Sequence, residues 1–421
     1  MHYSAGDTAW VLLSAALVLF MTPGLAFFYG GMVRSKNVLG MLMQNFATMA
    51  AVSLVWVFVS YSLAFGPDLG GKGLLGSLHF FALAHATQTV PGFSGHLAQH
   101  IPPLAFVIFQ MMFAIITAAL ITGSTADRMK FGPFIVLIIL WSLFVYAPIA
   151  HWSFSPTGWL YRLGTEDFAG GTVVEINAGA AGLAVAMVIG KRRGWPKSQM
   201  PPHNVPLTLV GAGILWFGWY GFNAGSALAA NTLAAHAFLN TNTAGAAALL
   251  GWIVVEKIRG GKSTILGAAS GAVAGLVAIT PSCGFVDIYG ATVIGLAAGV
   301  ICAFAVSLKY KYQLDDSLDV GGVHLVGGIV GTLLIGLFGT SAIGGVNGLL
   351  YGGGGVLLLH QTIAVLASGA YSFAASWILA KIVDKAMGLR VTPDQELEGL
   401  DTALHAESAY DFEGLMRSFG K

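Results

Sequence analysis

A lone carboxylate and a lone imidazole stand in two apolar, glycine-rich stretches. Glu175 lies within Gly171-Thr-Val-Val-Glu-Ile-Asn-Ala-Gly179, and His324 lies in a similar stretch further on. A charge at the centre of a bilayer costs at least ~2.5–3.5 kcal/mol, so it persists mainly where it faces a partner or a water-filled path. An imidazole, with a reference pKa near ~6.5, can hold or pass a proton. If the two stretches cross a membrane and meet, they form a candidate proton relay.

Composition places the chain in a membrane. Of its 421 residues, 56% are hydrophobic and 9% are charged, whereas soluble domains average about 25% charged residues. Its 57 glycines suit membrane helices, which pack closely through small residues. The net charge of +1 gives no reason to expect nucleic acid, and two cysteines, Cys283 and Cys302, are too few for a disulfide framework. We therefore predict an all-α polytopic membrane protein.

With about 20 apolar residues per span, the sequence predicts eleven transmembrane helices. Their approximate limits are 8–30, 41–66, 101–125, 132–150, 168–190, 204–225, 229–256, 263–281, 285–308, 322–341 and 357–386. The first apolar run is of full membrane length and follows no basic segment, so it predicts a span and not a cleaved signal peptide. Residues 1–389 form the predicted transmembrane domain, and 390–421 form a cytoplasmic tail.

Lysine and arginine are divided unevenly between the two sides. Alternate loops and the tail hold 18 of the 20 basic residues, and only Lys72 and Arg162 fall on the other side. Because basic residues concentrate in cytoplasmic loops, the N-terminus is predicted outside and the C-terminus inside. An odd number of spans requires this arrangement.

The surroundings of Glu175 and His324 share one spacing. Each residue is followed by glycines four and seven positions later: Gly179 and Gly182, Gly328 and Gly331. Each is preceded within eight positions by an acid and paired glycines: Asp167 with Gly170-Gly171, and Asp319 with Gly321-Gly322. Because they fall in the fifth and tenth spans, we predict inverted five-helix repeats, spans 1–5 and 6–10, plus an eleventh helix. Such repeats place the functional site at their midplane interface.

Several phrases along the chain are specific enough to suggest a family. In order they are Pro23-Gly-Leu-Ala-Phe-Phe-Tyr-Gly-Gly31, Phe109-Gln-Met-Met-Phe113-Ala114, Asp167-Phe-Ala-Gly-Gly171, Leu215-Trp-Phe-Gly-Trp-Tyr-Gly-Phe-Asn-Ala-Gly-Ser226, Asp319-Val-Gly-Gly-Val-His324 and Glu398-Gly-Leu-Asp401. From the first span to about Tyr410, the chain resembles the Amt/Mep/Rh ammonium transporter family in its bacterial Amt branch. The resemblance implies a homotrimer with one substrate path through each protomer.

The resemblance also implies roles for four residues along the path. Phe113 and Phe222 correspond to a stacked aromatic gate, Ser226 to the hydroxyl of an outer recruitment site, and Trp219 to a pore-lining aromatic residue of the inner half. The chemistry is consistent, because an aromatic face attracts ammonium by ~0.5–1 kcal/mol when exposed and ~2 or more when desolvated. A hydroxyl adds an acceptor. Without the motif, Phe113 and Phe222 would be read as core or lipid-facing residues.

Two further residues correspond to polar positions of the family. Asp167 matches an acid below the outer vestibule, thought to be structural and electrostatic. The bottom-up alternative, a cap of the fifth helix through backbone N–H groups, stays open beside a field effect on the cation. His324 matches the second of two hydrogen-bonded pore histidines, and the alternative is a satisfied core histidine.

The chain departs from the family at two positions. Most members have a histidine where this chain has Glu175, although some fungal members carry an acid. If Glu175 is anionic, it favours imidazolium and the pair titrates jointly; if desolvation prevails, it is protonated and donates to neutral His324. Phe154 aligns with the family's recruitment-site tryptophan, and as a weaker cation host it predicts a weaker or reshaped outer site. His151, nearby, is expected to be interfacial.

The leading functional hypothesis is ammonium uptake across the cytoplasmic (inner) membrane of a bacterium. Ammonium or methylammonium is recruited at Phe113, Phe154 and Ser226 and deprotonated at the gate, and ammonia, with or without a relayed proton, passes the Glu175–His324 pair. Neutral ammonia can cross an apolar lumen where a bare ion would face a large Born cost. We expect altered pH dependence or ion selectivity from Glu175.

The alternative hypothesis is an ammonium sensor or transceptor that signals through its tail with little flux. The tail resembles the family's regulatory C-terminus, and by that resemblance a P-II family signal protein is a possible partner at the cytoplasmic face, besides membrane lipid. No hydrolase constellation lies in adjacent spans, so an enzyme is not expected. No metal, nucleotide or redox cofactor is implied.

Overall fold

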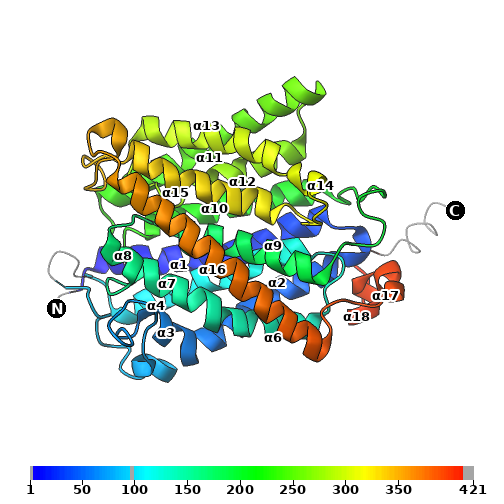
Figure 1. The fold of residues 1–421 in the computed structure, drawn as a ribbon, viewed down its shortest axis with the longest axis horizontal. Helices are drawn as coiled ribbons and strands as arrows, with labels where there is room; N and C mark the ends of the chain where they lie inside the picture. The colour runs from blue at the N-terminus through cyan, green and yellow to red at the C-terminus, as the bar shows by residue number, and fades with distance from the viewer. Residues whose placement is uncertain (1–2, 95–98, 411–421) are drawn as a thin grey trace.

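Long apolar helices run between two ends of the molecule (Figure 1). The computed structural model describes residues 3–94 and 99–410. Within these ranges ten helical stretches are long and apolar enough to cross a membrane: Ala5–Met32, Ser35–Phe65, Pro103–Thr125, Phe131–Leu163, Gly171–Ile189, Val205–Gly225, Thr232–Gly260, Ile288–Lys311, Gly321–Phe338 and Val356–Met387. The described chain has no strand, only isolated bridges, so the predicted all-helical class is confirmed.

The helix found at the predicted eighth span is shorter than the ten stretches named above. It corresponds to α12 (Ile265–Ile279), which has 15 residues. At ~1.5 Å per residue it covers roughly 22 Å, less than the ~30 Å of a hydrocarbon core. Most of α12 is buried among other helices, and irregular backbone at membrane depth is tolerated where protein surrounds it. The count of eleven spans stays a prediction.

Most spans are built from several elements. The longer helices are α1 (Ala5–Met32), α2 (Val38–Val55), α4 (Pro103–Leu120), α6 (Phe131–Trp141), α7 (Ala147–Phe154), α9 (Asn177–Ile189), α10 (Val205–Gly225), α11 (Thr232–Gly260), α12, α13 (Ile288–Ala305), α15 (Val326–Phe338) and α16 (Val356–Met387). The short ones are α3 (Tyr61–Phe65), α5 (Thr122–Thr125), α8 (Trp159–Leu163), α14 (Leu308–Lys311), α17 (Pro393–Glu398), α18 (Leu400–His405) and the 3₁₀ turns η1 (Ser35–Asn37), η3 (Leu78–Leu83) and η8 (Leu349–Tyr351). Four π-helical turns complete the spans: η2 (Trp56–Ser60), η5 (Ser142–Tyr146), η6 (Gly171–Ile176) and η7 (Gly321–Leu325).

Side-chain caps fix where four consecutive helices begin. Asn204, Asn231, Thr264 and Asp287 each accept a hydrogen bond from the backbone N–H three residues later, at 2.8–3.0 Å. A cap of this kind satisfies one of the N–H groups left free at a helix start. The helices α10, α11, α12 and α13 therefore start within three residues of the predicted limits.

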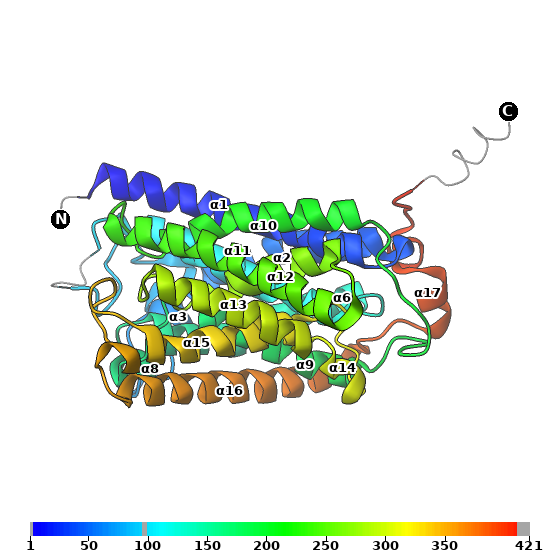
Figure 2. The same cartoon turned by 90° about the horizontal axis from the view of Figure 1, so that it is seen from above.

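Helices α1 and α10 pack antiparallel over their full length (Figure 2). Glycines make this possible: a Cβ on Gly31 would lie 2.5 Å from Thr208 N, and one on Gly211 only 2.2 Å from Phe28 N. At the other end of the pair, a Cβ on Gly225 would lie 2.5 Å from the Cβ of Ser14. Only glycine admits such close backbone contact.

The spans that carry Glu175 and His324 also cross through glycines. A Cβ on Gly179 would lie 2.4 Å from the backbone N of Leu325, and one on Gly328 would lie 2.9 Å from the Cβ of Glu175. The glycines four positions after Glu175 and after His324 are thus the points where α9 contacts η7 and where α15 contacts η6. The inverted repeats stay a prediction, with α1 and α10 as the first helices of the two halves and the spans of α9 and α15 as the fifth.

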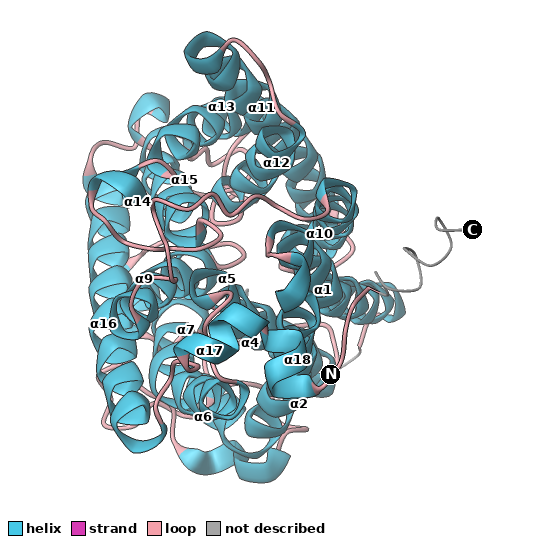
Figure 3. Ribbon diagram, turned by 90° about the vertical axis from the view of Figure 1, so that its right-hand side faces the viewer, coloured by secondary structure: helices cyan, strands magenta, loops and turns pink. Residues whose placement is uncertain are grey.

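The tail lies at the end of the bundle opposite the start of α1, here called the tail end (Figures 1 and 2), and Figure 3 views the molecule from this end. There α18 packs against the start of α2: Leu400 N donates to Asn37 Oδ1 at 2.8 Å, and Gly40 N donates to Asp401 Oδ1 at 2.8 Å. The tail is therefore folded onto the bundle up to the end of the described residues. The end where α1 begins is called the N-terminal end.

A buried ion pair joins two loops at the tail end. The Arg192 guanidinium donates to both Asp315 oxygens, with Nη2–Oδ1 at 2.8 Å and Nε–Oδ2 at 3.0 Å. Burial favours the neutral carboxyl, but the hydrogen bonds from Arg192 and the charges of Arg128 and Arg192 outweigh it, so the pKa of Asp315 lies below its ordinary value.

The two cysteines, Cys283 and Cys302, are buried and form no disulfide, as expected of packing residues.

Candidate functional site

Phe113 of α4 and Phe222 of α10 stack face to face in the interior. Their ring centroids are 4.2 Å apart and their planes differ by 21°. Phe113 is 0% and Phe222 1% exposed. Because α10 is held against α1 by glycine contacts and α4 packs beside both, each ring is carried by a rigid helix. Both stacked rings are therefore fixed in the protein interior.

Two aromatic residues flank the stack. Trp219, one turn before Phe222, lies 5.7 Å from it centroid to centroid, and its indole N–H donates to Thr280 Oγ1 at 2.8 Å. Phe154, the last residue of α7, meets Phe113 edge-on at 6.3 Å and 84°. The predicted gate and recruitment aromatics therefore lie side by side.

Ser226 caps the end of α10 next to this group. Its hydroxyl donates to the carbonyl of Phe222 at 2.8 Å. A hydroxyl that donates once still offers its lone pairs as acceptors. Ser226 is half-buried, so it is not sealed inside the protein as the two stacked rings are.

Glu175 and His324 form a direct hydrogen bond. Glu175 Oε2 and His324 Nδ1 are 2.7 Å apart, and the residues are 1% and 3% exposed. Each residue lies on a π-helical turn, η6 or η7, at the start of its span; Glu175 N donates to Gly170 O, five residues back, at 3.0 Å. Such turns recur at functional sites. Either protonation pattern, imidazole N–H to carboxylate or carboxyl O–H to imidazole nitrogen, places one proton between the two groups.

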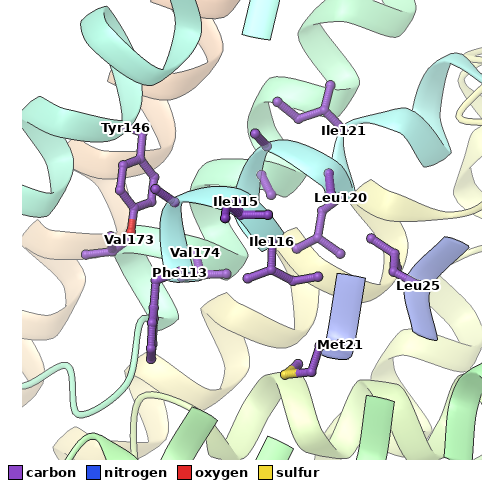
Figure 4. Packing of buried hydrophobic residues seen from close by; sticks show 14 of the residues in the cluster. Met21, Leu25, Phe113, Ile115, Ile116, Leu120, Ile121, Tyr146, Val173 and Val174 are labelled. Atoms are coloured by element: carbon purple, nitrogen blue, oxygen red, sulfur yellow. The ribbon is translucent and has the colours of Figure 1, made fainter. Parts of the chain in front are cut away.

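One narrow cavity is lined by both Phe222 and this pair. It has a volume of about 10 Å³, and its lining includes Phe222 and Trp219 on one side and Glu175 and His324 on the other. The remaining lining is apolar: Met21, Leu25, Phe28, Ile116, Leu120, Val174, Leu215 and Val273. Figure 4 shows Met21 and Leu25 of α1 with Ile116 and Leu120 of α4. A space of roughly this size holds about one water molecule, so the cavity has room for one small molecule at a time.

Asp167 caps the span that carries Glu175. Its carboxylate accepts from Gly170 N at 2.8 Å, Gly171 N at 2.6 Å, Thr172 N at 2.8 Å and the Thr172 hydroxyl. Burial raises the pKa of Asp167, and these hydrogen bonds oppose the rise only in part. The capping alternative is thus what the geometry shows; a field effect on a cation is compatible with it.

The counterpart of Asp167 in the other half is Asp316, not Asp319. Asp316 accepts from Gly321 N at 2.7 Å, Val320 N at 3.2 Å and Ser124 Oγ at 2.8 Å. It stands eight positions before His324, as Asp167 stands eight before Glu175. Asp319 instead pairs with Lys309 at 2.7 Å. To cap this span, a carboxylate has to reach the N–H groups of Val320 and Gly321, which lie four and five residues after Asp316. The equal offset of eight residues from each capping acid to Glu175 or His324 is the sequence signal that could have identified Asp316.

His151 is the second correction. It was expected at the membrane interface but is 0% exposed. Its ring nitrogens contact Ala64 O and Asp68 Oδ1 inside the N-terminal end. The position of His151 near the end of a span indicated an interface. However, α7 ends inside the protein and is covered by the loop that follows α3.

A sequence model of the Ammonium Transporter Family matches residues 9–410. The chain belongs to the ammonium transporter family. The chain is 52% identical over 433 residues to the ammonium transporter of Mycobacterium tuberculosis. The alignment covers 97% of the chain and 90% of the relative. The chain is 47% identical over 407 residues to the ammonium transporter Amt1 of Archaeoglobus fulgidus, covering 97% and 100%.

Solved structures agree with the sequence relatives. The fold is similar to the crystal structure of Candida albicans Mep2, with a TM-score of 0.87, 34% identity, and coverage of 94% of this chain and 88% of that one. It is equally similar to a structure called "Sensor Amt Protein", with a TM-score of 0.87, 30% identity, and coverage of 95% and 98%. The chain is therefore a multi-pass membrane protein with the Amt/Mep fold.

Proposed function

We propose that the protein takes up ammonium across the cytoplasmic membrane of a bacterium. The observation that carries the proposal is the narrow, mostly apolar cavity that lies between Phe222 of the stacked pair and the Glu175–His324 hydrogen bond. The relatives named above are called ammonium transporters. In the proposed orientation the N-terminal end faces outward and the tail faces the cytoplasm.

Recruitment takes place at Phe113, Phe154 and Ser226. The aromatic rings offer cation–π attraction of ~0.5–2 kcal/mol, depending on desolvation, and the Ser226 hydroxyl offers an acceptor. The stacked, buried rings exclude hydrated ions, so ammonium gives up a proton there, either to water on the outer side or to the relay formed by the Glu175–His324 pair, and ammonia enters the lumen. A potassium ion cannot give up a proton, and this chemical difference selects ammonium over an ion of similar size.

Conduction then proceeds past the Glu175–His324 pair. An apolar lumen admits neutral ammonia, whereas a bare cation would face a large desolvation cost. The pair is the hydrogen-bonding group that ammonia meets after Trp219. Because one proton is shared between two titratable groups, the pair can hold, pass or return a proton, so ammonia crosses with or without a relayed proton.

We also propose eleven spans in each protomer of a homotrimer, with residues 1–389 as the transmembrane domain and 390–421 as a regulatory tail. Large apolar side chains stay exposed on α10, α11 and α13, including Phe217, Leu239, Val254 and Phe304, which supports contact with lipid or neighbouring protomers. A P-II family signal protein is proposed as a partner at the tail end.

A second function is favoured by one specific observation. The tail is bonded to the α1–α2 junction through Leu400 and Asp401, and the fold is close to that of "Sensor Amt Protein". An ammonium sensor would use this connection to signal, with little flux.

Uptake of labelled methylammonium into vesicles that contain purified protein separates the two functions. Transport predicts saturable accumulation above protein-free vesicles, with competition by ammonium and none by potassium. Sensing predicts methylammonium binding without accumulation. Absence of both would contradict the proposed function.

A further inference from the structure

The end of α7 is fastened at three consecutive residues just before Phe154. His151 contacts the loop after α3, Trp152 Nε1 donates to Leu74 O of the same loop at 2.8 Å, and the Ser153 hydroxyl lies 3.0 Å from that of Thr172. Thr172 is in turn bonded to the cap residue Asp167. The position of the Phe154 ring is thus set from two sides, the loop and the capped start of η6.

The loop that holds α7 is itself closed by Asp68. Both oxygens of Asp68 accept from Gly73 N at 2.9 Å. The carbonyl of Gly73 accepts from Trp159 N at 3.1 Å, and a Cβ on Gly73 would lie 2.4 Å from that nitrogen. Gly73 also has φ +72°, which favours glycine. The loop from Asp68 to Gly76 therefore fits closely against α7 and α8.

Asp68 and His151 form the central contact between loop and helix. His151 Nδ1 lies 2.8 Å from Ala64 O, and Nε2 lies 3.3 Å from Asp68 Oδ1. A carbonyl and a carboxylate are both acceptors, and a neutral imidazole has only one N–H. Both hydrogen bonds form together only when His151 or Asp68 carries an additional proton. Arg162 is the other charged group nearby, and its guanidinium lies 3.5 Å from Gly71 O of the same loop.

We propose that the Asp68–His151 pair positions Phe154 against Phe113 and so sets the affinity of the outer cation site. His151 precedes Phe154 by three positions, so both lie on one face of α7. Releasing the pair frees the last turn of α7 and lets the Phe154 ring leave its edge-on contact with Phe113. Asp68 and His151 are positioning residues that do not touch the substrate. The inference rests on the proposed recruitment role of Phe154.

Two substitutions of Asp68 separate positioning from general damage. Asp68→Ala removes the contact, and the apparent KM for methylammonium uptake is expected to rise about three- to tenfold with Vmax within about twofold, because part of a cation–π attraction is lost. Asp68→Asn keeps the contact, since its amide N–H donates to neutral His151 Nε2 while its oxygen accepts from Gly73 N. That conservative variant is expected to retain the wild-type KM.

Asp287→Ala is the matched control. Asp287 also caps backbone N–H and holds a second residue, Tyr351, at the N-terminal end, yet it contacts neither α7 nor Phe154. Its KM is expected to stay unchanged. If Asp68→Ala does not fold, His151→Gln is measured in the same way. An unchanged KM in Asp68→Ala, or in His151→Gln where it replaces that variant, would overturn the inference. An equal rise of the KM in Asp287→Ala would overturn it as well.

A second readout does not depend on transport. With 4-fluorophenylalanine at position 154, the ¹⁹F resonance reports the ring's place beside Phe113. Asp68→Ala is expected to shift or broaden it, whereas Asp68→Asn and Asp287→Ala leave it in place. If the resonance does not move in Asp68→Ala, the positioning role is refuted, whether or not the wild type shows uptake. If the resonance shifts in Asp68→Ala but the wild type shows no uptake, only the proposed function is refuted.

Discussion

Replacing Gly179 by alanine is expected to pull the Glu175–His324 pair apart. The added Cβ would lie 2.4 Å from Leu325 N and 2.6 Å from Leu325 Cβ, where ordinary contact begins near 3.4 Å. The backbone beside His324 therefore has to move by about 1 Å, enough to stretch a hydrogen bond of 2.7 Å past the ~3.2 Å limit. Overpacking of this kind costs about 1–3 kcal/mol.

Thermal unfolding and methylammonium uptake measure the two consequences. Gly179→Ala is expected to lower the unfolding temperature by a few degrees and to reduce uptake. The control is Gly213→Ala on α10, where a Cβ meets no atom within 4 Å. That change is expected to be neutral or stabilising, because glycine inside a helix costs roughly 0.5–1 kcal/mol relative to alanine. If Gly179→Ala unfolds and transports like the wild type, the tight crossing is refuted.

Two further substitutions test other parts of the structure. Asp315→Asn removes the closer of the two carboxylates that pair with buried Arg192, leaving Asp127 at 3.4 Å, and is expected to cost up to about 3–5 kcal/mol. Because the pKa of Asp315 is lowered in the folded state, its stabilisation is present above the unfolded value of ~3.9 and is lost as pH falls through the folded pKa. Unfolding followed across pH should therefore show a steeper acid loss for the wild type; parallel curves would contradict the ion pair. Phe154→Trp is expected to lower the KM for methylammonium about two- to fivefold, because Trp is the better cation host; an unchanged or higher KM would remove Phe154 from the recruitment site.

Much of the fold was predictable because its signals are local. Twenty-residue apolar stretches located most of the helices to within a few residues. The repeated offsets of glycine after Glu175 and His324 predicted a meeting of two spans, since close backbone contact at membrane depth needs small residues. The residue types at positions 113, 154, 222 and 226 pointed to one site through the family's motifs.

What the sequence could not predict depends on three-dimensional contacts. Whether Asp316 or Asp319 caps the tenth span is decided by backbone geometry, because both acids lie close to paired glycines. The burial of His151 depends on a loop some 80 positions earlier in the chain, which pairs with it through Asp68. The length of α12 was overestimated because the apolar run continues into a buried turn, where composition does not distinguish helix from turn.

The most direct test of the proposed pathway is electrical. Currents evoked by ammonium on vesicles with the wild type and with Glu175→His are compared from pH 5 to pH 8. Because a carboxyl and an imidazole titrate over different ranges, the two pH profiles are expected to differ. Identical profiles would show that Glu175 takes no part in conduction and would contradict a pathway through the Glu175–His324 pair.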